Sequence, residues 1–518
     1  MRQGRVLRGA TTALLLAAML STVGAVARAQ DRSDPQAAAL AQSIRDLQAQ
    51  IEQLRSAVTE LRSEAAEYHA ENVALRQHLA ALQDKVVAPA GTGPVTARVD
   101  QATGVPGVAE AANQEQKPSV QEQLDLLAGK IDEQYQTKVE SASKYRVRLS
   151  GMVLFNMFSN RGTVDNIDYP HVADLGTPGQ RQTSLGGSLR QSLLGLEAFG
   201  PTIAGAKSSA DIQFDFAGGF PRVPDGVTFG IMRLRTATLR LDWANTSVVG
   251  GQDGLFFAPL SPTSFASVAV PPLAYTGNLW GWTPQLRVEH RFNVAADSTL
   301  TVQGGVLDPL SGEISSGYYY RTPQAGELAR MPALASRVAF TTNVFGQPMT
   351  VGVGGYYTRQ NWGFDRIIDA WAGTSDVTVP LGRRFSLSGE FYRGRGIGGL
   401  GGALGRSIIA SGPLDNPATV VRGLDDMGGW SQLKFKASSK LEFNVAAGED
   451  SAFRNEVLQL PAAGYYAAIS SNRSALGNFI YHPRSDLLFS LEYARLRTNS
   501  VYDYSSANHF SLSMGILF

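Results

Sequence analysis

The feature that most constrains the fold is a strict two-residue alternation over residues 509–518. Phe510, Leu512, Met514, Ile516 and Phe518 are apolar, and the residues between them are mostly small or polar. A period of two is typical of a β-strand whose two faces meet different surroundings. The apolar face must cover either a protein core or lipid, and the rest of the chain decides which.

Strand-like segments recur along the whole of 145–518, where all six tryptophans and every phenylalanine lie. We predict sixteen strands, at 146–158, 187–199, 204–217, 229–243, 246–257, 282–293, 297–307, 333–344, 347–361, 366–379, 383–396, 427–437, 439–449, 473–482, 485–499 and 507–518. Long helical patterns are absent from this region. The sequence therefore predicts an all-β domain over 145–518.

The connections between these segments alternate between long and short. The long ones include 159–186, 258–281 and 397–426, whereas the short ones include 244–245 and 438–439. Bacterial transmembrane barrels have an even number of strands, short periplasmic turns and long external loops. A soluble β-sandwich has no reason to sort its loops in this way, and its strands are usually nearer five or six residues. We predict a transmembrane barrel of about sixteen antiparallel strands, with the apolar face of 509–518 against lipid.

The N-terminal residues 1–29 are predicted to be a secretory signal peptide. Three arginines precede an apolar run over 10–26, and the Ala-Arg-Ala at 27–29 supplies a small-residue cleavage site. An uncleaved membrane anchor is the alternative, although the run is short for a span of about 20 residues. The chain has no cysteine, and its net charge of +1 offers no basic face for nucleic acid.

Residues 30–86 are predicted to form a periplasmic α-helical coiled coil. Apolar residues recur at heptad a and d positions without a glycine or proline after Pro35. The candidate oligomerisation residues are Ile44, Leu47, Ile51, Leu54, Val58, Leu61 and Asn72. Ile or Val at a with Leu at d favours two strands, so the heptads leave dimer and trimer open, and a single amphipathic helix is a further alternative. Residues 87–144 are predicted as a linker and a short helix.

This order of segments resembles that of the DcaP-like outer-membrane porins, and the phosphate-selective porins are a neighbouring possibility. The stretch RLRTATLRLDW at 233–243, followed by GGQDGLFFAPLSP at 250–262, resembles the family's segment that leads into an inward-folding loop. Residues 145–158 resemble its first strand. The resemblance implies a homotrimer with a coiled coil in the periplasm. The alternation that ends at Phe518 also resembles the signal that the barrel-insertion machinery reads.

A sixteen-stranded barrel is wide enough to leave an aqueous channel. The apolar, proline-rich residues 258–281 suit a loop packed inside the barrel, and an external cap against a neighbouring subunit is the alternative. We therefore expect an outer-membrane porin for passive diffusion of small hydrophilic solutes.

Arginine outnumbers lysine strongly from residue 145 onwards. A guanidinium binds carboxylate or phosphate through a planar fork, which predicts small anionic, dicarboxylate-like solutes. The candidate pore-lining residues are Arg146, Arg148, Arg190, Arg233, Arg235, Arg240, Arg287, Arg393 and Arg395. The alternative is that they pair with Asp211, Asp215, Asp242, Glu289 or Glu390 and only solvate the wall.

The sequence was also searched for cofactor, metal, catalytic and nucleotide-binding motifs. We expect no cofactor and no metal site, because none of the six histidines has a partner at metal-ligand spacing. His290 and His509 are the candidates for a barrel enzyme, but no Ser-His-acid arrangement is recognisable, and we predict no enzymatic activity. The sequence GIGGLGG at 396–402 has the letters of a dinucleotide fingerprint without a following helix, and is predicted to be a flexible external loop.

Two further roles concern the cell envelope. A barrel that anchors the coiled coil could act as a tether towards peptidoglycan, which is the alternative to a porin. Outer-membrane lipid and lipopolysaccharide are expected partners, and the acidic residues Asp165, Asp168 and Asp174 are candidates for binding lipopolysaccharide or Ca²⁺. The predicted location is the cell outer membrane, with the coiled coil in the periplasm.

Overall fold

A computed structural model of the chain describes residues 138–139, 146–174, 183–228, 230–313, 321–459 and 468–518. The predicted signal peptide at 1–29 and the predicted coiled coil at 30–86 lie outside these residues, as does almost all of 87–144. Within the described ranges, no helix has the length and apolar character needed to cross a membrane.

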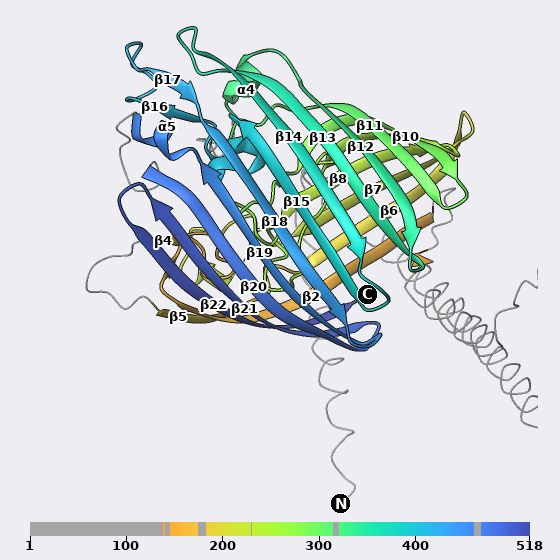
Figure 1. The fold of residues 1–518 in the computed structure, drawn as a ribbon. Coiled ribbons are helices and arrows are strands. Elements are labelled where there is room, and N and C mark those ends of the chain that lie inside the picture. Colours follow the sequence, from red (N-terminus) through yellow and green to blue (C-terminus); the bar gives the residue numbers. More distant parts are fainter. Residues whose placement is uncertain (1–137, 140–145, 175–182, 229, 314–320, 460–467) are drawn as a thin grey trace, which may run out of the picture. The chain divides into compact units, whose positions relative to one another are not determined.

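The described chain forms a closed antiparallel β-barrel of sixteen strands (Figure 1). The strands are β2 (Arg146–Arg161), β6 (Leu193–Ile203), β7 (Ala206–Asp215), β8 (Arg233–Asp242), β9 (Thr246–Asp253), β10 (Thr283–Ala295), β11 (Ser298–Leu307), β12 (Ala333–Val344), β13 (Gln347–Asn361), β14 (Ile367–Pro380), β15 (Phe385–Arg395), β18 (Asp425–Lys436), β19 (Leu441–Ala452), β20 (Ile469–Arg484), β21 (Leu487–Ser500) and β22 (Tyr504–Leu517). Each pairs with the next along the chain. The barrel closes where β2 pairs with β22, from Met152↔Leu517 to Arg161↔Asn508.

All sixteen predicted strands are confirmed, and the bounds of β12 and β13 match the prediction. The second predicted strand, 187–199, is interrupted: β5 (Thr183–Ser188) pairs with one half of β2 and β6 with the other half. The fifth predicted strand ends early, because β9 stops at Asp253 and the chain then turns into the barrel. The two-residue β1 (Lys138–Val139) extends the sheet beside β2.

The predicted sorting of connections by length is also confirmed. Short turns join the strands at one end of the barrel, and the long connections lie at the other, which we call the external end. The external connections carry the remaining elements: β3 (Thr163–Val164), β4 (Ala173–Asp174), η1 (Gly226–Thr228), α4 (Ala325–Leu328), η2 (Gly398–Leu400), η3 (Gly402–Gly405), β16 (Ile408–Ala410), β17 (Val421–Gly423) and α5 (Arg454–Gln459).

The two faces of the sheet differ as the alternation predicts. On β22, the outward Phe510, Leu512, Met514 and Ile516 are between 38% and 56% exposed, whereas the inward His509, Ser511 and Ser513 are at most 2% exposed. The apolar face of 509–518 therefore points out of the barrel. In a bilayer this face meets lipid, and a charge at mid-depth on it would cost about 2–4 kcal/mol.

Aromatic rings mark both edges of the outer apolar band. Near the turns, Phe385, Phe435, Phe443 and Phe479 form a row with centroid separations of 4.6, 6.2 and 6.3 Å. Towards the external end, Trp371 points outward and is 40% exposed. Such belts are typical of membrane barrels, where amphipathic rings lie at the interface.

Candidate solute pathway

The connection between β9 and β10, residues 254–282, folds into the barrel. The amide of Leu260 donates to Glu390 Oε1 (2.7 Å), and the amide of Thr263 donates to Gln432 Oε1 (2.6 Å). Both acceptors are on the inner face, because they alternate with the exposed Phe391 and Leu433. The predicted loop at 258–281 is therefore inside the barrel, and the alternative of an external cap is wrong. We call residues 254–282 the inner loop.

Wall residues on both sides hold the backbone of the inner loop. On one side, Arg233 Nη2 donates to Ala269 O (2.6 Å) and Arg235 Nη1 donates to Val268 O (3.0 Å). Gln191, which is fully buried, donates to Ala266 O (2.8 Å) and accepts from two loop amides (2.7 and 3.0 Å). Buried backbone groups need such partners, since leaving one unpaired costs about 1–3 kcal/mol. The wall thus fixes a segment that has little regular structure of its own.

The sequence of the inner loop also allows its close approach to the wall. Gly277 has φ +100°, and a Cβ built on it would lie 2.2 Å from the carbonyl oxygen of Gly429. Only glycine suits both the backbone conformation and the contact. The neighbouring Leu273, Trp430 and Ala446 pack together where the inner loop meets β18 and β19.

The inner loop is packed tightly on one side and leaves space on the other. Towards β20–β22, the cavity between the inner loop and the wall has a volume of ≈ 30 Å³. Towards β9–β12, the cavity has a volume of ≈ 350 Å³, and its wall carries Asp253, Arg287, Gln303 and Arg337. The larger cavity is therefore the candidate solute pathway.

Arginines and carboxylates form a continuous network on the wall of this pathway. Arg287 Nη1 donates to Asp253 (2.7 Å) and its Nε donates to Glu289 (2.8 Å). Gln303 joins Glu289 to Arg337, which forms a two-point ion pair with Asp376 (2.8 and 2.6 Å). Each guanidinium has five N–H donors, so these bonds leave donors over for a solute. The predicted pairing with Glu289 is therefore present.

The predicted arginines of β8 lie on the same wall. Arg240 contacts Asp242 (2.8 Å) and Glu289 (3.4 Å). Arg233 and Arg235 share Asp215, at 2.5 and 3.8 Å, so two cations face one carboxylate. Both point inward because a register shift between β7 and β8 interrupts the alternation there.

Three other predicted arginines lie away from the cavity. Arg146 and Arg148 are on the inner side of β2 near the turn end, where Arg148 lies 3.7 Å from Glu197. Arg190 is buried at the break between β5 and β6 and binds Asp168 (2.7 Å). The prediction missed Arg337 and Arg291, which face inward on β12 and β10.

The prediction that Arg393 and Arg395 line the pore is wrong. They continue the outward series of Phe385, Leu387 and Phe391, and they pair with β18 beside the exposed Met427. Arg395 binds Asp425 (2.7 Å), and Arg393 lies over the outward ring of Trp371 (5.6 Å). The alternation of the strand places both guanidinium groups outside the barrel.

The inner face has a basic half and an acidic half. On the described inner face of β2 and β6–β12, the charged residues are Arg146, Arg148, Lys207, Arg233, Arg235, Arg240, Arg287, Arg291 and Arg337, against Glu197, Asp211, Asp215, Asp242, Asp253 and Glu289. On β14–β21 they are Lys434 and Lys436, against Asp376, Glu390, Asp426, Glu442, Asp450 and Glu492. The candidate pathway borders the basic half.

A second connection also folds inward. Residues 396–402, predicted as a flexible external loop, form η2 and the start of η3, and Leu400 is 1% exposed. The amide of Trp280 in the inner loop donates to Leu400 O (3.0 Å), and Ala403 N donates to Asp426 (2.9 Å). These contacts place the segment inside the barrel, so the prediction of an external loop is wrong. Its glycines allow the close packing of backbone against backbone.

The acidic residues of the first external loop serve the loop itself. Asp165 accepts from the amides of His171 (2.9 Å) and Val172 (3.0 Å), while Asp168 binds Arg190. Burial raises the pKa of Asp165, but its bonds to the His171 side chain and to these amides outweigh burial and hold the pKa below its usual value. Asp174 also has partners. Among the described residues, no group of acidic or histidine side chains is arranged to hold a metal ion.

The two histidines considered for catalysis contact uncharged polar groups. His290 Nδ1 lies 2.8 Å from Thr246 Oγ1, and the ring packs against Phe292. His509 Nδ1 lies 2.7 Å from Asn160 Oδ1 and is buried inside the barrel.

Comparison with solved structures identifies the fold. Residues of this chain superpose on the outer-membrane channel DcaP of Acinetobacter baumannii with a TM-score of 0.55 and 17% identity, covering 74% of this chain and 100% of that chain. The fold is that of the DcaP channel. An anion-selective porin from Comamonas acidovorans (TM-score 0.45, 11% identity, 72% of this chain and 100% of that one) and Salmonella typhi OmpF (0.45, 10%, 72% and 98%) match less well. No family model and no curated protein matches the sequence.

The DcaP-like fold is a porin-like outer-membrane channel fold, and it fits a location in the outer membrane. At this identity the likeness carries the architecture and no more. What the channel admits has to be argued from its own inner wall.

Proposed function

We propose that this chain is an outer-membrane porin for passive diffusion of small hydrophilic solutes, with a preference for anions such as dicarboxylates. The observation that supports the proposal is the position of the free space. The inner loop closes the side of the barrel that carries the acidic wall, and it leaves ≈ 350 Å³ beside Arg287 and Arg337.

The expected selectivity is moderate, because carboxylates already bind most of the arginines on this wall. A solute carboxylate would use the guanidinium donors that Asp253, Glu289 and Asp376 leave over. The excess of one cation at Arg233 and Arg235 adds to the attraction for anions. Charged rings and the width of the narrowest section together set selectivity in such channels.

The test is planar-bilayer recording of the purified protein across a KCl gradient. We expect stepwise conductance with a reversal potential on the anion side, and a reduction of the KCl current by succinate. A reversal potential on the cation side would reject the anion preference, but the proposal that the protein is a channel would still hold. Insertion without conductance would reject the channel itself.

We further propose that the porin is a homotrimer assembled through the coiled coil at 30–86. The heptad residues support this assignment, and their removal in a chain lacking 30–140 is expected to abolish the trimer. Three equal conductance steps for each insertion would agree with the proposal. Single steps from the complete chain would contradict it.

A tether role needs only the coiled coil and the barrel, so it is compatible with a channel. Loss of envelope attachment with unchanged conductance in the chain lacking 30–140 would favour the tether. We propose no enzymatic activity, since His290 and His509 both contact uncharged polar groups.

A further inference from the structure

Four arginines gather on the outer face of the barrel near its external end. Arg473 on β20 and Arg497 on β21 are direct cross-strand partners. Arg495 on β21 and Arg161 on β2 both pair with Asn508 of β22, one from each side. All four are exposed on the face that also carries Tyr493 and Phe510. We call these four residues the arginine patch.

The charges of the arginine patch are poorly balanced within the chain. Glu449 binds Arg473 (2.7 Å), and Arg497 donates to the uncharged Asn499 (3.1 Å). The side chains of Arg161 and Arg495 form no hydrogen bond or ion pair with any described residue. Directly opposed strand residues have Cβ atoms about 5 Å apart, and like charges there are destabilising. An anion outside the barrel would relieve this repulsion.

The depth of the arginine patch corresponds to the external edge of the bilayer. Arg495 and Arg497 lie eight and ten residues beyond Leu487, the first residue of β21. A tilted strand rises about 2.5 Å per residue, which places them about 20–25 Å above the turns, near the top of an apolar band about 25 Å tall. On β14 the equivalent level carries Trp371. On β21 this level carries arginines instead, and Arg497 lies over the ring of Tyr504 (4.4 Å to the centroid).

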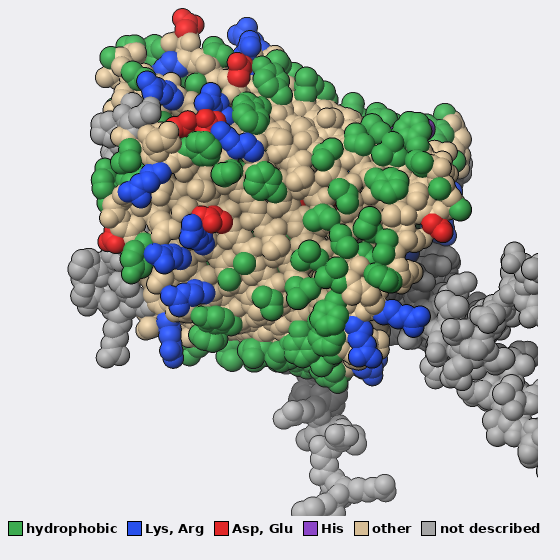
Figure 2. All heavy atoms as spheres, viewed as in Figure 1, with side chains coloured by type: hydrophobic (Ala, Val, Ile, Leu, Met, Phe, Trp, Pro, Cys, Tyr) green, Lys and Arg blue, Asp and Glu red, His purple; other side chains and the backbone are tan. Residues whose placement is uncertain are grey.

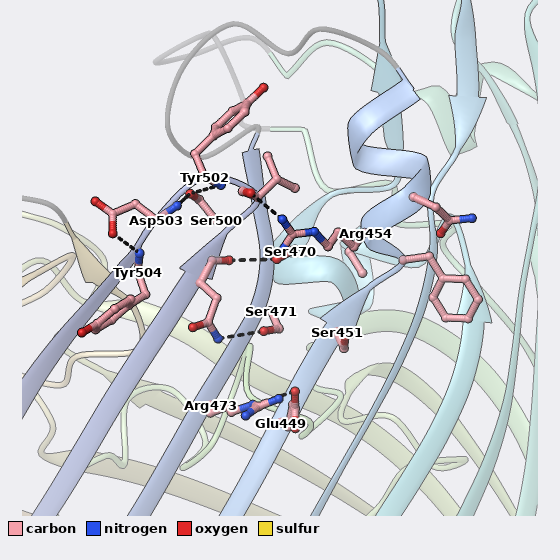
Figure 3. Close-up of a pocket in the computed structure, with 15 residues that line it drawn as sticks. Glu449, Ser451, Arg454, Ser470, Ser471, Arg473, Ser500, Tyr502, Asp503 and Tyr504 are labelled. Atoms are coloured by element: carbon pink, nitrogen blue, oxygen red, sulfur yellow. Dashed lines mark hydrogen bonds and ion pairs between the residues drawn. The ribbon is translucent and has the colours of Figure 1, made fainter.

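A polar hollow adjoins the arginine patch on the same outer face (Figure 3). Its volume is ≈ 660 Å³, and its lining includes Ser451, Ser471, Arg473, Asn499 and Tyr504. Figure 3 shows the Arg473–Glu449 pair at one edge of the hollow and Arg454 at another. Hydroxyl, amide and guanidinium groups in this position would be costly against hydrocarbon, and they suit the polar headgroup of a lipid.

Two kinds of occupant could cover this face, a second copy of the chain or an anionic lipid. On the described strands, the outward carboxylates are Asp369, Asp425 and Glu449, and each already binds an arginine of its own barrel. A second copy would therefore bring no spare strand carboxylate to the patch. Lipid phosphate groups carry the missing charge, and guanidinium groups bind them through paired hydrogen bonds.

We propose that the arginine patch binds the phosphate groups of a phosphorylated lipid in the external leaflet, and that the polar hollow receives the rest of its headgroup. Figure 2 shows basic side chains gathered along the left of the view, at the external ends of the strands labelled β20–β22 in Figure 1, whereas hydrophobic side chains dominate over β10–β13. The barrel would therefore hold this lipid on one side.

The test compares two triple variants of the complete chain in a neutral detergent. R161Q/R495Q/R497Q removes three charges of the patch and keeps the Arg473–Glu449 pair. R383Q/R384Q/R484Q removes the same charge from exposed residues at the turn end. Native mass spectrometry measures retention of diphosphorylated lipid A. Each basic residue near an anionic lipid contributes about 1 kcal/mol of binding free energy, so we expect the affinity of the patch variant to be about 10- to 100-fold lower. The control variant should bind as the natural chain does.

Each outcome decides the proposal. Weaker lipid A binding by the patch variant alone, with an unchanged oligomeric state, supports it. The proposal is overturned if all three proteins bind lipid A equally, or if the control variant loses binding as much as the patch variant does. It is also overturned if the patch variant loses its oligomeric state, which would indicate that the arginine patch is an interface between copies of the chain. Equal retention of dephosphorylated lipid A would also overturn it. Bilayer conductance of the same variants shows separately whether the channel proposal holds.

Discussion

Two walls of one barrel use arginine on opposite faces. On β8–β12 the arginines point inward, against carboxylates and the open side of the inner loop, and the outer face is apolar. On β20–β22 the inner face packs against the loops with asparagine, serine and buried acids, and the arginines point outward. Arginine side chains therefore face the interior of the barrel on one wall and its outer surface on the other. Whether an arginine points inward or outward depends on whether its position in the strand is odd or even relative to the inward residues.

The largest expected effect is on stability, from breaking an inward pair. In Arg337→Gln, Asp376 loses its two-point partner while only 3% exposed, and breaking a buried pair from one side costs about 3–5 kcal/mol. Urea unfolding of the barrel in detergent measures this loss. The double variant R337Q/D376N should recover much of it, and a double variant as unstable as the single one would show that the pair is not coupled.

The next effect concerns the clamp on the inner loop. Gln191→Ala removes three hydrogen bonds to the inner loop, each with a net contribution of about 0.5–1.5 kcal/mol where water can take the place of the lost side chain. The inner loop should loosen, and single-channel conductance should become larger and noisier. The control Gln252→Ala removes a bond to Arg235 O outside the pathway (2.8 Å) and should leave the conductance unchanged. Equal currents from both variants would mean that Gln191 does not hold the loop.

Ion selectivity should depend on the arginines of the inner face and not on those of the outer face. A unit charge about 5 Å from a monovalent ion in water is worth about 0.8 kcal/mol. Arg287→Gln should therefore weaken the attraction for an anion about fourfold and the repulsion of a cation about fourfold, which lowers the anion-to-cation permeability ratio by up to about 16-fold. Arg395→Gln removes the same charge from the outer face and should leave the reversal potential unchanged. An equal shift in both variants would assign the preference to the overall field of the barrel rather than to the inner wall.

The smallest effect is expected for the outward ion pair. The side chains of Arg473 and Glu449 are 58% and 42% exposed, and exposed pairs contribute about 0–1 kcal/mol. Arg473→Gln should therefore hardly change the urea midpoint in detergent. A loss comparable to that of Arg337→Gln would contradict the assignment of this pair to an exposed surface.

The sequence already indicated, for many of the arginines, whether the side chain points into or out of the barrel, because residues of the same parity in a strand share a face. Phe385, Leu387 and Phe391 share the parity of Arg393, so the alternation that predicted β15 also indicated an outward guanidinium. Arg337 likewise shares the parity of the small residues Ala335 and Ala339. Treating arginines as one group, without assigning each to a face, produced both errors.

Other features could not be predicted from the alternation. Arg233 and Arg235 have the opposite parity to the inward Arg240, and they face the same side as Arg240 only because the register shifts between β7 and β8. No periodic pattern in the sequence marks such a shift. The tight and open sides of the inner loop depend on contacts with Gln191 and Gln432, which lie far apart along the chain. Strand positions follow from local hydrophobicity, whereas the pathway follows from which walls meet across the barrel.

The seam between β2 and β22 has a kinetic consequence. It joins the first and last of the sixteen strands, and Gly151 and Phe518 exchange backbone hydrogen bonds across it (2.8 and 3.1 Å). This pairing has the highest contact order in the barrel, so it is expected to form late, after the neighbouring hairpins. Until then the growing sheet has two unpaired edges that can add foreign strands. Any chaperone that binds the chain before the barrel closes must therefore keep these strand edges from pairing with other chains.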